Sequence, residues 1–135
     1  MSKSALVLAL FIAWTLLLLV VMEVLRSHLV VTGRTRSNEF DRENSKLSPF
    51  MQRLARAHAN CLEGLPVFGG LLVVALVTGR SEVTDPLAPW LLGARIVQSG
   101  IHLASTSVVA VNVRFTAFAV QMAIATYWAW ALIVR

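Results

Sequence analysis

The sequence is poor in charged residues and nearly devoid of cysteine. Only 14% of its 135 residues are Asp, Glu, Lys or Arg, whereas 57% are hydrophobic. A soluble domain of this length could not bury so much apolar side chain. The composition therefore excludes an ordinary soluble protein and indicates an integral membrane protein in contact with lipid. The single cysteine, Cys61, excludes an intrachain disulfide.

The few histidines and the modest net charge argue against a metal site and against nucleic-acid binding. The three histidines lack metal-ligand spacing with one another or with Cys61, so we predict no metal site. The net charge of +5 reflects a modest excess of basic residues. In a membrane protein such an excess chiefly reports topology, and we predict no nucleic-acid partner.

Long apolar runs, in contrast, are abundant. A membrane-spanning helix needs about 20 residues, and four such segments fit into the chain as one domain over residues 1–135. Ser48-Pro49 and Asp85-Pro86 each have the pattern of a helix start, with a capping side chain before a proline. The predicted fold is an all-α, integral membrane four-helix bundle. Its spans cover approximately residues 4–31, 48–78, 86–109 and 112–134.

The connections between the spans differ in charge. The Thr32–Lys46 segment contains four basic residues, and Arg114 marks the short turn between the last two spans. Cytoplasmic loops carry an excess of Lys and Arg, so we predict that both connections are cytoplasmic and that both termini face the other side. Trp90, Trp128 and Trp130 suit an aromatic belt on that outer side.

Two of the spans carry a narrow polar stripe, with successive members three, four and three residues apart. Side chains with this spacing lie on one face of a helix. A charged group in lipid costs about 3 kcal/mol on insertion scales, so the stripes must face the bundle interior or another subunit. They either only hold helices together or form a polar ligand site. The stripes are Arg53, Arg56, Asn60 and Glu63, and Arg95, Gln98, His102 and Ser105.

Arginine predominates among the residues that could form such a site. Arg36, Arg56, Arg95 and Arg114 could converge on the cytoplasmic side, with Glu63 paired to Arg95 or to a neighbour's arginine. Guanidinium groups bind carboxylates in a bidentate fork, and exposed N–H groups in the first turn of the last span would add positive potential beside Arg114. The pattern suits a small anionic, zwitterionic ligand with peptide-like groups.

The second span resembles the family of membrane-associated proteins in eicosanoid and glutathione metabolism. The matching string is RLARAHANCLEGLPVF at residues 53–68, with an Arg-Ala-His-x-Asn-x-x-Glu core. Weaker matches follow the order expected for the family across nearly the whole chain. They are TGRTR at residues 32–36, ARIVQSGIH at residues 94–102 and VNVRF at residues 111–115.

This resemblance implies a homotrimer that binds glutathione between the helices of adjacent protomers. Residues on the second span would line the glutathione site, and Arg95, Gln98 and His102 would face them from the neighbouring subunit. Arg114 would be the catalytic residue near the thiol, which it would hold as thiolate. The thiolate would attack a lipophilic electrophile from the bilayer, as in a transferase or peroxidase. The other implied site residues are Arg36, Arg53, Arg56, Asn60 and Glu63.

Two positions depart from the family pattern. His102 stands where characterised members have a tyrosine, and Ala59 where some relatives have another arginine. Enzymatic activity therefore stays open. The expected location is a bacterial inner membrane.

The alternatives to a glutathione-binding protein are a small proton-coupled transporter, with Glu23 or Glu63 as the transport carboxylate, and a non-catalytic membrane module whose stripes only specify trimerisation.

Overall fold

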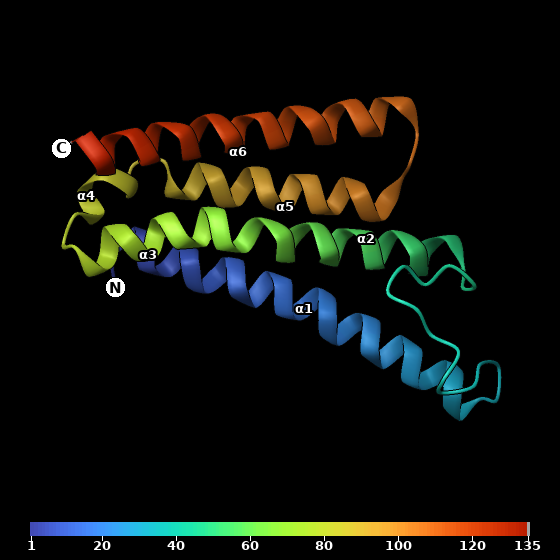
Figure 1. The fold of residues 1–135 in the computed structure, drawn as a ribbon. Coiled ribbons are helices and arrows are strands. Elements are labelled where there is room, and N and C mark those ends of the chain that lie inside the picture. Colours follow the sequence, from blue (N-terminus) through green and yellow to red (C-terminus); the bar gives the residue numbers. More distant parts are fainter. Residues whose placement is uncertain (135) are drawn as a thin grey trace.

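Helices make up nearly all of the architecture. The computed structural model describes residues 1–134, and three of its helical segments are long and apolar enough to cross a membrane: Lys3–Val31, Pro49–Val77 and Val108–Val134. The helices in chain order are α1 (Lys3–Val31), α2 (Pro49–Gly64), the π-helix η1 (Leu65–Gly69), α3 (Gly70–Val77), α4 (Ser81–Thr84), α5 (Ala88–Ala104) and α6 (Val108–Val134) (Figure 1).

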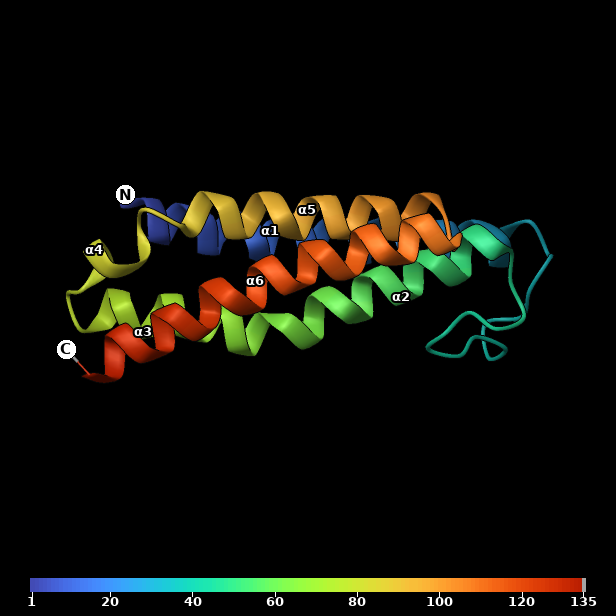
Figure 2. The ribbon, with the colours of Figure 1, turned by 90° about the horizontal axis from the view of Figure 1, so that it is seen from above.

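The long helices run antiparallel to their neighbours in the chain (Figures 1 and 2). α5 packs against α1, α2 and α6. Both termini lie at one end of the bundle, here called the terminal end, and residues 32–48 lie at the other, the loop end. With 17 residues, α5 is about 26 Å long, shorter than the other three helical segments. The predicted all-α bundle is confirmed.

The second helical segment starts at the predicted cap and contains an irregular turn. The Ser48 hydroxyl accepts a hydrogen bond from the Met51 N–H at 3.2 Å, and Pro49 occupies the first turn. Pro66 has no N–H to donate, and its ring would crowd the carbonyl four residues earlier in a regular α-helix. The chain accommodates it in the wider turn of η1, so α2 continues through η1 into α3.

Asp85 caps a different helix from the one predicted. Leu87, not Asp85, precedes the first residue of α5. The Asp85 carboxylate instead accepts bonds at the start of α1, from the Ser4 N–H at 2.9 Å and the Ser4 hydroxyl at 2.6 Å. The Ser4 and Thr84 hydroxyls also bond each other. A long-range partner therefore satisfies an N–H group that α1 cannot pair internally.

The predicted boundary between the last two spans was misplaced by several residues. α5 ends at Ala104 instead of near Val109, and α6 begins at Val108 instead of near Asn112. The Ser107 hydroxyl accepts a bond from the Ala110 N–H at 3.2 Å, so a serine cap starts α6 earlier than expected. Arg114 consequently lies in the second turn of α6, beyond the exposed N–H groups that were expected beside it.

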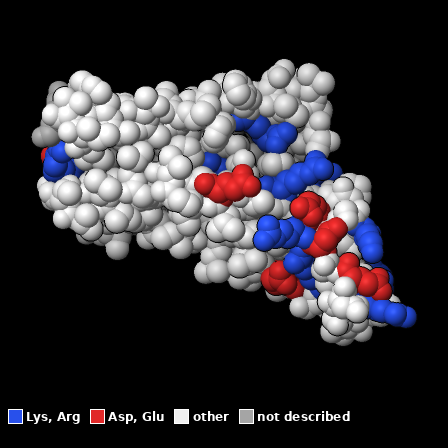
Figure 3. All heavy atoms as spheres, in the orientation of Figure 1, with Lys and Arg blue, Asp and Glu red and all other residues white. Residues whose placement is uncertain are grey.

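The loop between α1 and α2 is tied to both helices. Arg26 donates to Asn44 Oδ1 at 2.6 and 3.0 Å and to the Asp41 carbonyl at 2.9 Å. It also forms an ion pair with Glu23 at 3.1 Å. Asn44 Nδ2 in turn donates to the Met51 carbonyl at 2.8 Å. The basic loop segment is therefore held against the bundle, and most of the visible charge gathers at this end (Figure 3).

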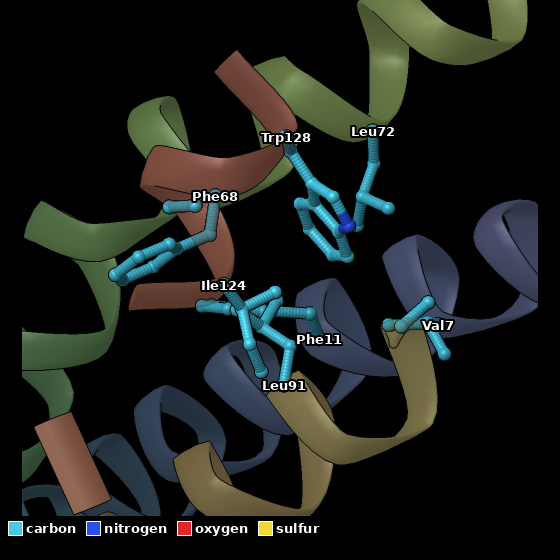
Figure 4. Close-up of a cluster of buried hydrophobic side chains, with 9 residues drawn as sticks. Val7, Phe11, Phe68, Leu72, Leu91, Ile124 and Trp128 are labelled. Atoms are coloured by element: carbon cyan, nitrogen blue, oxygen red, sulfur yellow. The ribbon is translucent and has the colours of Figure 1, made fainter. Parts of the chain in front are cut away.

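The main hydrophobic core fills the terminal half of the bundle. Phe11, Phe68, Leu72, Leu91 and Trp128 contribute to it from α1, η1, α3, α5 and α6 (Figure 4). Trp128 is completely buried, so its predicted place in an interfacial aromatic belt is wrong. The ring belongs to a core cluster that also contains residues of α1, η1, α3 and α5, and burying a large aromatic ring is favourable.

Removing the carboxylate of Asp85 is expected to loosen the terminal end. Asp85→Ala leaves the Ser4 N–H and hydroxyl without this acceptor and should lower the free energy of unfolding by about 1 kcal/mol. Thermal unfolding in detergent measures the effect. Glu82→Ala is the matched control, because it removes an exposed carboxylate from the same connection. Equal melting temperatures for the two variants would contradict the capping role.

Candidate functional site

The two polar stripes meet inside the bundle. Arg95 Nη1 donates to Asn60 Oδ1 at 2.5 Å, and Gln98 Nε2 donates to the same oxygen at 3.0 Å. Arg95 and Gln98 are buried on α5, whereas Asn60 on α2 is partly exposed. The predicted facing of the stripes thus occurs within one chain. The resemblance had implied a contact from the neighbouring subunit.

Arg95 is held by aromatic faces in addition to the amide. Its guanidinium carbon lies 5.5 Å from the centre of the Phe11 ring and 5.6 Å from that of Phe68, within cation–π range. Gly64 provides the remaining space, because a Cβ there would lie 2.8 Å from Arg95 Nη2. The expected Arg95–Glu63 ion pair is absent from the described residues: Glu63 is exposed, and Arg95 bonds Asn60 instead.

Gln121 on α6 belongs to this network, and sequence reasoning missed it. Its Nε2 donates to Gln98 Oε1 at 2.8 Å and to the Ala117 carbonyl at 3.1 Å. Gln121 is completely buried. The available signal was its position as the only strongly polar side chain in a long apolar run after Thr116. The network therefore joins α2, α5 and α6 across the bundle.

A second polar group lies towards the loop end. The buried His102 imidazole lies near Arg56 and Arg114, so three predicted site residues come together here. The Nε of Arg114 is buried and has no hydrogen-bond acceptor among the described residues. Arg53 Nε donates to the Leu103 carbonyl at 2.8 Å, where it satisfies the end of α5. This group is rich in positive charge that is not neutralised by a carboxylate partner.

Arg36 joins neither the hydrogen-bond network around Arg95 nor the polar group around His102. It lies in the loop after α1 with its side chain 86% exposed, and its ion-pair partner is Glu39 at 3.7 Å. Of the remaining predicted residues, Arg56 and Glu63 are exposed on α2.

A groove opens beside this network between α2, η1 and α6. Its volume is about 390 Å³. Asn60, Glu63 and Gly64 form its polar part, and Phe68 meets Phe118 edge to face at its wall, with ring centres 6.4 Å apart. The rest of the lining is mostly apolar and comprises Val67, Met122, Ala125 and Thr126. A single site thus combines hydrogen-bonding groups with an apolar surface.

The sequence from residue 4 to residue 134 matches the family model described as MAPEG family. This chain belongs to the MAPEG family. Together with its apolar helices, that membership makes it an integral membrane protein. Searches among curated proteins and among solved structures each gave no significant match.

Other potentially reactive groups are spread out in this MAPEG protein. Within residues 1–134, no three His, Cys, Asp or Glu side chains come together as a metal-binding group. Cys61 is completely buried, with its sulfur 3.1 Å from the Ser99 hydroxyl. It packs as a small interior side chain.

A methyl group at Gly64 is expected to disturb the Arg95 contacts. The Cβ of Gly64→Ala would also lie 3.1 Å from the Phe68 ring, so the pinned guanidinium has to move. We expect a lower melting temperature despite the higher helix propensity of alanine. Gly93→Ala on α5 is the control, since an added Cβ there meets nothing within 4 Å. A Gly64→Ala protein as stable as Gly93→Ala would contradict the role assigned to this glycine.

Proposed function

We propose that this membrane protein binds glutathione, or a closely related thiol, and joins it to lipophilic electrophiles or uses it to reduce them. The observation that carries the proposal is the groove, because hydrogen-bonding residues and apolar walls line the same space. A hydrophilic thiol and a lipid-soluble substrate could meet there. Membership of a family associated with glutathione metabolism supports the choice of thiol.

The charges along the site suit glutathione, which has two carboxylates and one ammonium group. Arg56 and Arg114 lack an ion-pair partner among the described residues, and the partly exposed Asn60 offers an amide. Glu63 supplies a carboxylate for an ammonium or amide N–H. Arg53, Arg95, Gln98 and His102 would complete or support the binding site, whereas Arg36 would have to reach it from another subunit.

Arg114 is the residue that we assign to the thiol. A thiol of this kind has a pKa of about 8.5, so little of it is ionised at neutral pH. A nearby guanidinium lowers that pKa because it stabilises the thiolate. Arg114 is partly exposed, and its buried Nε has no hydrogen-bond partner among the described residues. When bound, glutathione would supply sulfur for a new carbon–sulfur bond while the leaving group departs with its bonding electrons.

The proposed assembly is a homotrimer in the membrane. Arg56 and Glu63 are exposed on the single chain even though they belong to a helical segment that can span the bilayer. Contact with lipid would cost about 3 kcal/mol for a charged group at the bilayer centre. A neighbouring subunit over this face would avoid that cost and would enclose the polar part of the groove.

The concentration of basic residues at the loop end supports a cytoplasmic location for Thr32–Lys46. We propose a bacterial inner membrane, with electrophiles entering the groove from the bilayer. Among the described residues, the Glu23 carboxylate is about half exposed and forms an ion pair with Arg26, which does not favour its role as a transport carboxylate.

Glutathione added to the purified protein in detergent is expected to produce thiolate ultraviolet absorbance below the ordinary pKa of the thiol. Arg114→Ala should abolish this absorbance at neutral pH and return the thiol pKa towards about 8.5. Absorbance recorded over a pH series measures the shift directly.

Arg42→Ala serves as the charge-matched control, since it removes an exposed arginine from the loop. It should leave both the thiolate signal and the thermal stabilisation by glutathione unchanged. Thermal stabilisation without thiolate would indicate binding alone. If millimolar glutathione changes neither the absorbance nor the melting temperature of the unsubstituted protein, the proposed function is rejected.

A further inference from the structure

We propose that Gln121 is a positioning residue that, through Gln98, helps Arg95 to hold the side-chain amide of Asn60 with its nitrogen available to the groove. The inference rests on the proposed function, because it assigns a donor-and-acceptor pattern to the same site. Gln121 does not line the groove. It acts on Asn60 indirectly, through its hydrogen bond to Gln98 and the hydrogen bond from Gln98 to Asn60.

The side-chain amides of Asn60, Gln98 and Gln121 form a hydrogen-bonded series, and only one assignment of oxygen and nitrogen satisfies all its bonds. At one end, Arg95 has only donors, so the Asn60 atom that it contacts must be the oxygen. At the other end, the Ala117 carbonyl is only an acceptor, so the Gln121 atom that it contacts must be the nitrogen. Gln98 lies between them and has to present oxygen to Gln121 and nitrogen to Asn60. Rotating any one amide by 180° would place two donors or two acceptors against each other.

This direction determines what the groove presents to a ligand. Asn60 Oδ1 already accepts from both Arg95 and Gln98, which leaves Nδ2 as the free hydrogen-bonding atom. Glu63 follows three residues later on the same helical face and offers only acceptors when ionised. The groove therefore selects a ligand that places a carbonyl or carboxylate oxygen at Asn60 and an ammonium or amide N–H at Glu63.

Stability alone does not account for Gln121. Its side chain is completely buried, and its Oε1 has no hydrogen-bond partner among the described residues. An unpaired buried acceptor is destabilising, and an apolar residue of similar size would avoid it. The buried glutamine is explained if its other atom, Nε2, is needed to orient Gln98.

The direct test observes the Asn60 amide without any ligand. Labelling with ¹⁵N-asparagine marks only four side chains, and Asn60→Asp identifies the Asn60 signal by its loss. We expect Gln121→Met to shift or broaden that signal. Thr15→Val is the control, because it removes a different buried hydrogen bond, from the Thr15 hydroxyl to the Phe11 carbonyl, and involves none of the three amides. Thr15→Val should leave the Asn60 signal in place.

Glutathione affinity provides a second test through a double-mutant cycle. Gln121→Met should weaken binding roughly fivefold to tenfold, as expected for misplacing one hydrogen-bonding group. In an Asn60→Ala background the same substitution should have no further effect, because Gln121 acts through Asn60. A general loss of stability would instead weaken both backgrounds equally.

The outcomes separate the inference from the proposed function. An unchanged Asn60 signal in Gln121→Met, or equal losses of affinity in both backgrounds, would overturn the positioning role. Absence of glutathione binding by the unsubstituted protein would reject the proposed function, while the Asn60 signal would still decide the role of Gln121. If Gln121→Met does not fold, Gln121→Asn replaces it, since a shorter amide should produce the same shift.

Discussion

The hydrogen bond from the buried Arg95 to Asn60 is the interaction on which the rest of the interior depends. A guanidinium without contact to solvent must find acceptors or aromatic faces. Asn60 accepts from Arg95 Nη1, and the Phe11 and Phe68 rings lie within cation–π range, whereas Nε and Nη2 have no hydrogen-bond partner among the described residues. Meeting that requirement brings α1, η1 and α5 close to α2. The Arg95 guanidinium also occupies the Asn60 oxygen, and its position requires a residue without a side chain at position 64.

The same requirement explains how far the sequence could predict the fold and the site. The long apolar runs determine the spans, and the spacing of Arg95 and Gln98 on α5 indicates which face of that helix turns inward. Those predictions depend on local periodicity. Gln121 was missed because one polar residue produces no periodic signal, and the Asn60–Arg95 pairing within one chain depends on tertiary packing.

The misplaced helix ends have a related cause. A residue such as Asp85 is suited to capping any helix start that it reaches, and local sequence favoured the helix that follows it. The folded chain instead brings Asp85 to Ser4, 81 positions away. Ser107 similarly starts α6 before the expected residue, which moved Arg114 away from the first turn. Capping motifs identify capping chemistry more reliably than they identify the helix that is capped.

The contact between Ser4 and Asp85 also constrains the order of events during synthesis. Chains emerge from their N-terminus, so all residues of α1 are made well before residue 85. Until then the Ser2 hydroxyl can accept from the Ala5 N–H, but the Ser4 N–H and hydroxyl lack the acceptor that Asp85 provides. The terminal end of the bundle therefore closes late, after α2 and α3 have returned the chain to the side where it began.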